Sequence, residues 1–144
     1  MALDGYRYPL VVVRDGPAGG EALRVGIDAA VRGRGRLMIV CPTRAPQPWS
    51  WWIPPGFIVP NDSAANDRLL AAARAQVPAD LPLTVQQLRS PPPPLRSQIA
   101  NAAWAHRCDL IVLGATAARS GTRCRLADWL DRRTPATVLA VRAP

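Results

Sequence analysis

The stretch Asp109–Gly114, which reads DLIVLG, decides the fold class of this chain. Four consecutive apolar residues between an aspartate and a glycine are typical of a strand that is buried on both faces, as in a parallel sheet covered by helices. A second apolar run, TVLAV, follows at Thr137–Val141 after a segment of small and basic residues. A glycine at the carboxyl end of such a strand marks the edge where open α/β sheets bind ligands. We therefore expect any ligand site to lie close to Gly114.

Strands and helices alternate along the rest of the chain. Short apolar runs predict strands, and apolar residues at three-and-four spacing between cap signals predict helices. This alternation calls for parallel pairing through right-handed crossovers, hence an α/β fold, in one domain over residues 1–144. Leu83–Leu88 alternates and predicts a half-exposed strand at a sheet edge. The expected strands are Leu10–Val13, Leu37–Cys41, Leu83–Leu88, Asp109–Gly114 and Ala136–Arg142, and the expected helices are 21–32, 61–76, 95–106 and 126–132.

The composition is that of a globular protein, because 49% of the 144 residues are hydrophobic. No apolar run approaches the roughly 18 residues of a membrane span, so we expect no membrane association. The amino terminus has neither a basic region nor a cleavage signal of a secreted protein. Three cysteines, Cys41, Cys108 and Cys124, are an odd number without CxxC spacing, which favours reduced thiols and a cytoplasmic location.

The formal charge of +8 comes entirely from arginine, since the chain has no lysine. Basic charge is evidence for non-specific association with polyanions and not for a fold. The arginines are spread from Arg7 to Arg142, whereas a dedicated nucleic-acid face should cluster its charge. This distribution favours a generally basic surface over a nucleic-acid partner. A nucleic-acid-associated protein is kept as an alternative that predicts binding weakened steeply by salt.

The chain resembles the universal stress protein family over nearly its whole length. LVVVRDG at Leu10–Gly16 is similar to the family's opening "VAVDGS", and DLIVLG is similar to its fourth strand, "DLIVVGS". TPATVLAVR at Thr134–Arg142 is similar to the last strand after "PCPVLVV". The resemblance implies a three-layer α/β/α fold with a five-stranded parallel sheet in the order 3-2-1-4-5. It also implies a homodimer paired through the last strand, and a family in which some members bind ATP and others do not.

The family's phosphate loop is only partly present in this sequence. ATP-binding members place a first-strand aspartate near the nucleotide and wrap the phosphates in a loop G-x2-G-x9-G-[S/T]. Asp15 matches the aspartate and Gly114 the first glycine, but the second glycine falls on Ala117. The closing pair falls on Ala127-Asp128 counting forward, or on Cys124-Arg125 aligning back from the last strand. A nest of backbone amides depends on glycine at defined positions, and a carboxylate at Asp128 would repel phosphate. We therefore expect no ATP and no other cofactor.

A nucleotide-binding alternative remains open. Guanidinium groups suit phosphate oxygens and would replace the missing amides, while Gly121 gives the loop a tight turn of its own. If ATP or AMP binds, the resemblance and the loop arginines place it at Asp15, Cys41, Gly114, Ala117, Arg119, Gly121, Arg123 and Arg125.

The stretch Pro42–Pro60 holds six prolines and four aromatic residues, Trp49, Trp51, Trp52 and Phe57. Proline excludes a regular helix or a central strand there. Several large rings are rarely free in solution, which favours burial against the protein's own pocket or its dimer mate. The alternative is an exposed loop that contacts a protein partner, since aromatic residues are enriched at interface centres.

No catalytic or metal-binding constellation is evident. His106 is the only histidine, and a lone histidine at a helix end is typical of packing, because general-base work needs a positioned partner. Ser120 has no G-x-S-x-G context, and no set of metal ligands exists. We expect a regulatory or protective protein, not an enzyme, that acts through dimerisation and protein partners.

Overall fold

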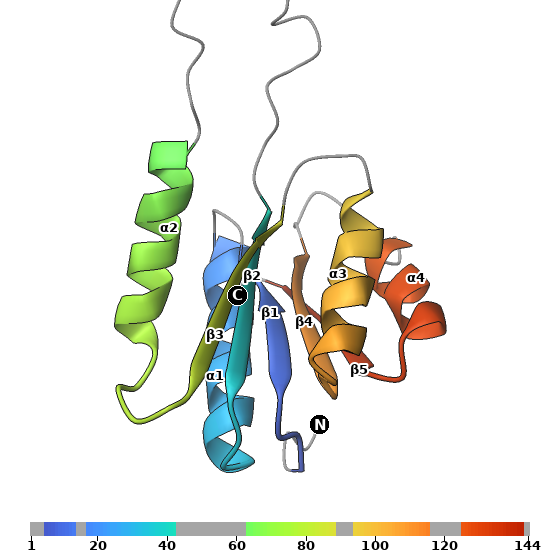
Figure 1. The fold of residues 1–144 in the computed structure, drawn as a ribbon, viewed down its shortest axis with the longest axis horizontal. Helices are drawn as coiled ribbons and strands as arrows, with labels where there is room; N and C mark the ends of the chain where they lie inside the picture. The colour runs from blue at the N-terminus through green and yellow to red at the C-terminus, as the bar shows by residue number, and fades with distance from the viewer. Residues whose placement is uncertain (1–4, 14–16, 43–62, 89–93, 116–124, 143–144) are drawn as a thin grey trace, which may run out of the picture.

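The computed structural model describes residues 5–13, 17–42, 63–88, 94–115 and 125–142. Within these residues, five strands form one parallel sheet in the order β3-β2-β1-β4-β5 (Figure 1). The order is the one that the family resemblance implied, and the parallel pairing is the one that the alternation of strands and helices predicted. The strands are β1 (Pro9–Val12), β2 (Leu37–Pro42), β3 (Leu83–Leu88), β4 (Leu110–Ala115) and β5 (Thr137–Arg142).

Four helices cover the two faces of the sheet. Right-handed crossovers that run from β1 towards β3 and then from β3 back to β5 must place their helices on opposite faces. Figure 1 shows α3 and α4 in front of the sheet and α1 behind it, with α2 beside β3. The predicted three-layer α/β/α architecture is confirmed. The helices are α1 (Pro17–Arg32), α2 (Ser63–Gln76), α3 (Leu95–Ala105) and α4 (Arg125–Arg133).

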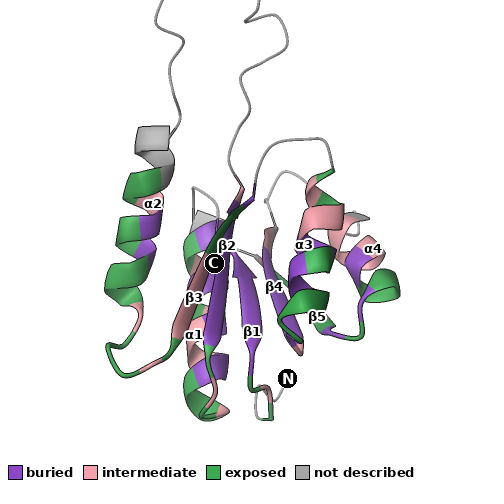
Figure 2. Cartoon of the chain, in the orientation of Figure 1, coloured by how far each residue is buried: buried purple, intermediate pink, exposed green. Residues whose placement is uncertain are grey.

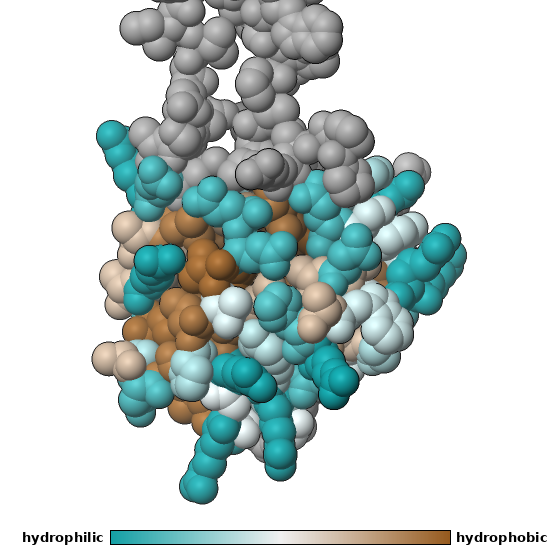
Figure 3. Space-filling model, viewed as in Figure 1, coloured by the Kyte–Doolittle hydropathy of each residue, from teal (hydrophilic) through white to brown (hydrophobic). Residues whose placement is uncertain are grey.

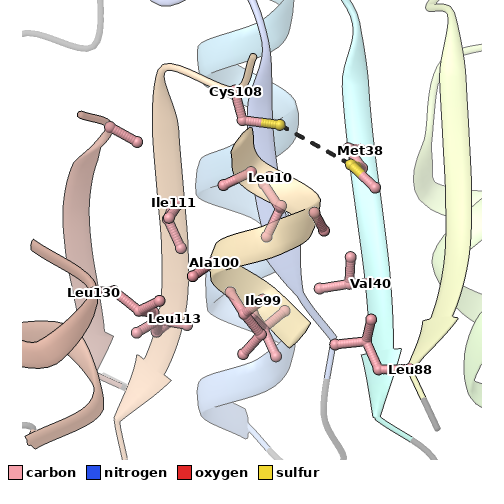
Figure 4. Packing of buried hydrophobic residues seen from close by; sticks show 14 of the residues in the cluster. Leu10, Met38, Val40, Leu88, Ile99, Ala100, Cys108, Ile111, Leu113 and Leu130 are labelled. Atoms are coloured by element: carbon pink, nitrogen blue, oxygen red, sulfur yellow. Dashed lines mark hydrogen bonds between the residues drawn. The ribbon is translucent and has the colours of Figure 1, made fainter. Parts of the chain in front are cut away.

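Each face of the sheet has its own apolar core, and the strands of the middle are buried on both sides (Figure 2). Leu10 packs towards α3 and α4, and its neighbour Val11 packs towards α1. Alternation of this kind explains why the central strands read as unbroken apolar runs. Figure 4 shows the first of these cores, in which Ile99 of α3 and Leu130 of α4 lie against Ile111 and Val40 of the sheet.

The described elements depart from the sequence expectations mainly at their ends. Helix α1 begins at Pro17, four residues before the predicted start at Glu21, because proline is well suited to the first helical turn. Strand β3 has the half-exposed character that its alternation predicted, and it is an edge strand.

Trp104 of α3 lies outside the core, although a tryptophan at a helical position is most simply a core or interface residue. Its side chain is 58% exposed, and its indole N–H donates a hydrogen bond to the carbonyl oxygen of Arg133 at 3.1 Å. His106 is the carboxyl cap of α3 and is exposed, which agrees with the helix-terminal interpretation. Trp129 is half-buried against the core on the α3–α4 face. None of the helices in the described part of the chain is long and apolar enough to cross a membrane.

Candidate functional site

The sequence-predicted site lies at the carboxyl edge of the sheet, where parallel strands all end. Strand β1 lies between β2 and β4, and the chain leaves β1 towards β2 but leaves β4 towards β5. This reversal between β1 and β4 is the switch point at which open α/β sheets bind ligands. Gly114, the fifth residue of β4, is half-buried there opposite Val141 of β5. The fold therefore places Gly114 where the sequence analysis expected a ligand.

Cys41 reaches the same edge from β2 but faces the core. The residue is 0% exposed and packs in the cluster between the sheet and α1. Burial raises the pKa of the Cys41 thiol. A buried thiol with a raised pKa is a small apolar side chain in practice, so Cys41 has no surface for a ligand.

The amino end of α4 carries a carboxylate. Asp128 lies in the first turn of this helix and is half-buried. An acidic side chain in a first turn stabilises the helix, because the free backbone N–H groups there carry partial positive charge. A phosphate group at the same helix end would compete with that carboxylate.

The remaining predicted residues cannot be placed in this geometry. Arg125 is the first residue of α4, and its side chain is not described. The others lie outside the described residues: Asp15, Ala117, Arg119, Gly121 and Arg123 of the nucleotide alternative, and Trp49, Trp51, Trp52 and Phe57 of the aromatic loop.

A shallow hollow among the described residues lies elsewhere. It is an open depression of about 390 Å³ between the end of α2 and the start of β3, lined by Arg74, Val77, Leu83 and Val85 among others. Figure 3 shows apolar surface in this part of the molecule. In the same described ranges, no group of three histidine, cysteine or acidic side chains is placed to hold a metal ion.

Comparison with solved structures identifies the architecture. The chain matches a universal stress protein family structure from Burkholderia pseudomallei with a TM-score of 0.69 and 20% identity, over 94% of this chain and 96% of that one. Universal stress protein UspA from Lactobacillus plantarum matches with a TM-score of 0.63 and 21% identity, over 95% and 98%. A universal stress protein solved in complex with cAMP matches with a TM-score of 0.56 and 20% identity, over 96% and 98%. The chain has the universal stress protein fold. A scan against protein-family models and a search of curated proteins found no match.

The universal stress protein pattern can now be compared with the placed residues. Its closing glycine-serine pair, counted forward from Gly114, falls on Ala127 and Asp128, and both lie inside α4. Ala127 packs against the core on the α3–α4 face.

Sequence reasoning missed the role of Asp109, the first letter of the stretch that decides the fold. Its carboxylate accepts the backbone N–H groups of Arg7, at 2.7 Å, and Tyr8, at 2.9 Å. These bonds fix the chain just before β1 to the chain just before β4. An aspartate directly before a buried strand is the signal that could have indicated this, since a carboxylate suits free backbone donors at a sheet edge.

Proposed function

We propose that this chain is a universal stress protein-like regulatory or protective protein that acts through dimerisation and protein partners and does not bind ATP. The observation that carries the proposal is Asp128 in the first turn of α4, at the helix end where phosphate would otherwise be stabilised. Two negative groups cannot share that position without a large electrostatic cost. The fold is the part of this proposal that the comparisons support directly.

The proposed dimer uses the free side of β5. This strand is the last of the sheet and pairs only with β4 among the described residues. An unpaired strand edge is a template for another strand, and a second copy related by a two-fold axis would satisfy its backbone groups. Ala140 is exposed on this strand, which leaves room for a neighbour beside it.

A ligand test and a mass measurement examine the two parts of the proposal separately. We expect no adenine nucleotide to be released on denaturing the purified protein, and no thermal shift with ATP, AMP or cAMP. A ligand that binds the native state but not the unfolded state stabilises a protein in proportion to the logarithm of the ligand concentration. A concentration-dependent thermal shift would therefore overturn the proposal that the chain does not bind ATP.

The oligomer is tested by light scattering after size exclusion. We expect a dimer for the wild type and a monomer for Ala140→Arg, because a long charged side chain would separate two copies at β5. Ala71→Arg is the matched control, since Ala71 is exposed on α2, away from that strand. A monomeric wild type, or an Ala140→Arg protein that stays dimeric, contradicts the proposed interface.

Nucleotide binding with arginines at the phosphates is the second candidate function. The solved complex with cAMP favours it, because a single phosphate needs fewer contacts than a triphosphate. In that case the double variant Arg119→Gln/Arg123→Gln should remove the thermal shift, whereas Arg24→Gln on the surface of α1 should keep it.

A further inference from the structure

The arginines that are dispersed in the sequence come together in space at the amino edge of the sheet. In a parallel α/β fold every helix runs against the strands, so all helices end at the edge where the strands begin. Figure 3 shows long hydrophilic side chains extending from this edge, which is the lower side of the view. Several exposed arginines lie at this edge, either just before a strand or in or just after the last turn of a helix. They are Arg7, Arg32, Arg34, Arg36, Arg74, Arg107, Arg132 and Arg133.

Ring contacts and a hydrogen bond involve part of this set and its aromatic neighbours. The Arg36 guanidinium lies 4.9 Å from the centre of the Tyr8 ring, and the Tyr8 ring meets His106 edge-on, with centroids 6.4 Å apart. Two residues before His106, the Trp104 indole N–H donates a hydrogen bond to the backbone carbonyl oxygen of Arg133, whose guanidinium lies 5.3 Å from the centre of the Trp129 ring. The row, which we call the amino-edge row, consists of Arg34, Arg36, Tyr8, His106, Arg107, Trp104 and Arg133.

Two members of the row have a backbone conformation that disfavours arginine. Arg34 has φ 52° and Arg107 has φ 54°, both in the left-handed region. Each follows a helix that ends with the same pair of backbone hydrogen bonds. After α1, the N–H groups of Gly35 and Arg34 donate to the carbonyl oxygens of Ala30 and Val31. After α3, the N–H groups of Cys108 and Arg107 donate to the carbonyl oxygens of Ala103 and Trp104. Glycine is the usual residue at this position, because it has no side chain to clash. Arginine at both positions costs stability that glycine would recover.

Trp104 gives the row an aromatic surface. Its only hydrogen-bond donor is already used inside the protein, so the ring is held in place while 58% of the side chain stays in water. A fixed, exposed indole at an edge that carries several arginines is a stacking platform for a planar group. Simple helix-end electrostatics explains arginine near a helix terminus, but it does not explain an exposed tryptophan among them.

Few acidic groups oppose the charge at this edge. The Asp109 carboxylate already accepts two backbone N–H groups, and Asp28 pairs with Arg32 at 3.2 Å. Among the described residues, the other acidic side chains at this edge are those of Asp80 and Asp131, and both are exposed. The balance at the amino edge is positive.

We infer that the amino-edge row binds single-stranded nucleic acid, with arginines at the phosphates and an unpaired base stacked on Trp104. Guanidinium groups with an exposed ring are the combination that single-strand sites use. A duplex keeps its bases stacked and offers no free ring face to Trp104, and an anionic membrane would need charge but no ring. This inference does not rest on the proposed function, because the row lies at the opposite edge from Gly114.

The test measures the binding of labelled single strands of about twelve nucleotides by fluorescence anisotropy, a length within the range of common single-strand sites. The full protein should bind at low salt, and the affinity should fall with a log–log slope of about −0.7 for each phosphate contacted. Duplex of the same sequence and vesicles rich in phosphatidylserine should bind more weakly. No binding at low salt, or equal binding of duplex or vesicles, overturns the inference.

Two variants locate the site. Arg34→Gly/Arg107→Gly should lower the salt slope by about 1.4 in magnitude, from two lost phosphate contacts, while raising the melting temperature. Its matched control is Arg24→Gln/Arg68→Gln, which removes two charges from α1 and α2 away from the row. Equal losses in both double variants would mean general attraction to a basic surface, and the inference fails.

The aromatic contact is tested by Trp104→Ala, which should weaken binding about fivefold to hundredfold. Trp104→Phe keeps a ring and should retain most of the affinity, and circular dichroism confirms that both variants are folded. Unchanged affinity in Trp104→Ala overturns the stacking contact. Because the glycine variants are expected to be more stable than the wild type, the charge test stands even if a tryptophan variant unfolds.

Discussion

The two edges of the sheet differ in how their functional groups are supported. At the carboxyl edge, Gly114 is half-buried, Cys41 faces the core, and Asp128 lies at the start of α4. At the amino edge, Asp109 and Tyr8 form a network of hydrogen bonds and ring contacts between separate segments. The family resemblance directs attention to the first edge, whereas the hydrogen bonds and ring contacts just named, which involve described residues, lie at the second.

Connection length is one physical difference between the edges. At the amino edge the chain passes from a helix to the next strand in three to six residues, 33–36, 77–82, 106–109 and 134–136. At the carboxyl edge, residues 13–16 and 89–94 are connections of similar length, but residues 43–62 separate β2 from α2 and residues 116–124 separate β4 from α4. Short connections have little conformational freedom to lose, so their side chains are positioned at low entropic cost. Substitutions at the amino edge measure how much its contacts contribute to the free energy of unfolding.

The largest effect is expected for Gly35→Ala. A methyl group at this position would overlap the carbonyl group of Arg7, and the neighbouring Arg36 N–H bonds the same carbonyl at 2.9 Å. The backbone would have to move, so we expect a loss of about 3 kcal/mol in the free energy of unfolding. Urea unfolding followed by circular dichroism measures it.

Gly20→Ala is the matched control, because a methyl group there meets nothing within 4 Å. It lies in α1, where alanine is favoured over glycine by about 1 kcal/mol, so this variant should be more stable than the wild type. If Gly35→Ala were also neutral or stabilising, the close approach of the two segments at the amino edge would be wrong.

Asp109→Ala tests the bonds that tie the starts of β1 and β4 together. Removing the carboxylate leaves the N–H groups of Arg7 and Tyr8 without their partner, which should cost about 2–3 kcal/mol for two charge-assisted bonds. Asp109→Asn keeps one acceptor oxygen and should lose roughly half as much. Hydrogen exchange at the Tyr8 amide should accelerate in the alanine variant. An unchanged exchange rate would show that the bond to Asp109 does not protect this amide.

Alkaline pH should destabilise the protein through Cys108, at the amino edge. The side chain is 4% exposed, and burial together with the charge of Asp109 raises the pKa of its thiol from 9.0 to about 12. The folded thiol stays neutral while the unfolded one ionises, so stability is complete below pH 9 and is lost as the pH rises from about 9 towards 12. At pH 10 the loss is about 1.4 kcal/mol.

The comparison of urea unfolding at pH 8 and pH 10 isolates this contribution. Cys108→Ala should lose less stability between the two pH values than the wild type, by roughly the amount given above. Cys41→Ala should show the same sign, because burial also raises the pKa of Cys41 at the other edge. Identical pH dependence in the wild type and Cys108→Ala would contradict the neutral buried thiol.

The sequence allowed the fold to be predicted because its strongest signals are those of a buried parallel sheet. The runs at Leu110–Leu113 and Thr137–Val141 became neighbouring strands, and the alternation of Leu83–Leu88 became an edge strand. The start of α1 was placed too late, at Glu21, whereas the helix begins at Pro17 and includes Gly19 and Gly20, which are poor helix formers. Tertiary packing of the apolar stripe overrode that local preference.

The candidate site was harder to predict for two different reasons. The nucleotide alternative depends on loop residues such as Asp15 and Arg119, which lie outside the described residues. The amino-edge row depends on topology, because Arg34 and Arg107 are far apart in the sequence and lie at the same edge of the sheet only because two helices end there. The even spread of arginines along the chain therefore gave no indication of where they gather.

The smallest effect is expected for Arg34→Gly, and it has the opposite sign. Relief of the left-handed conformation at φ 52° should stabilise the protein by about 0.5–1 kcal/mol, after allowance for the greater freedom of glycine in the unfolded chain. Arg107→Gly should behave alike, and the two should add, because they follow helices on opposite faces of the sheet. Thermal unfolding of the two single variants and the double variant measures this.

Arg68→Gly is the control that separates conformation from charge. It removes the same charge from an exposed position inside α2, where glycine costs about 1 kcal/mol, so it should destabilise the protein. If Arg34→Gly and Arg68→Gly changed stability in the same direction, net charge and not backbone strain would be responsible. Opposite signs would mean that arginine at these two left-handed positions lowers the stability of the fold. Such a loss of stability is expected where residues are retained for binding.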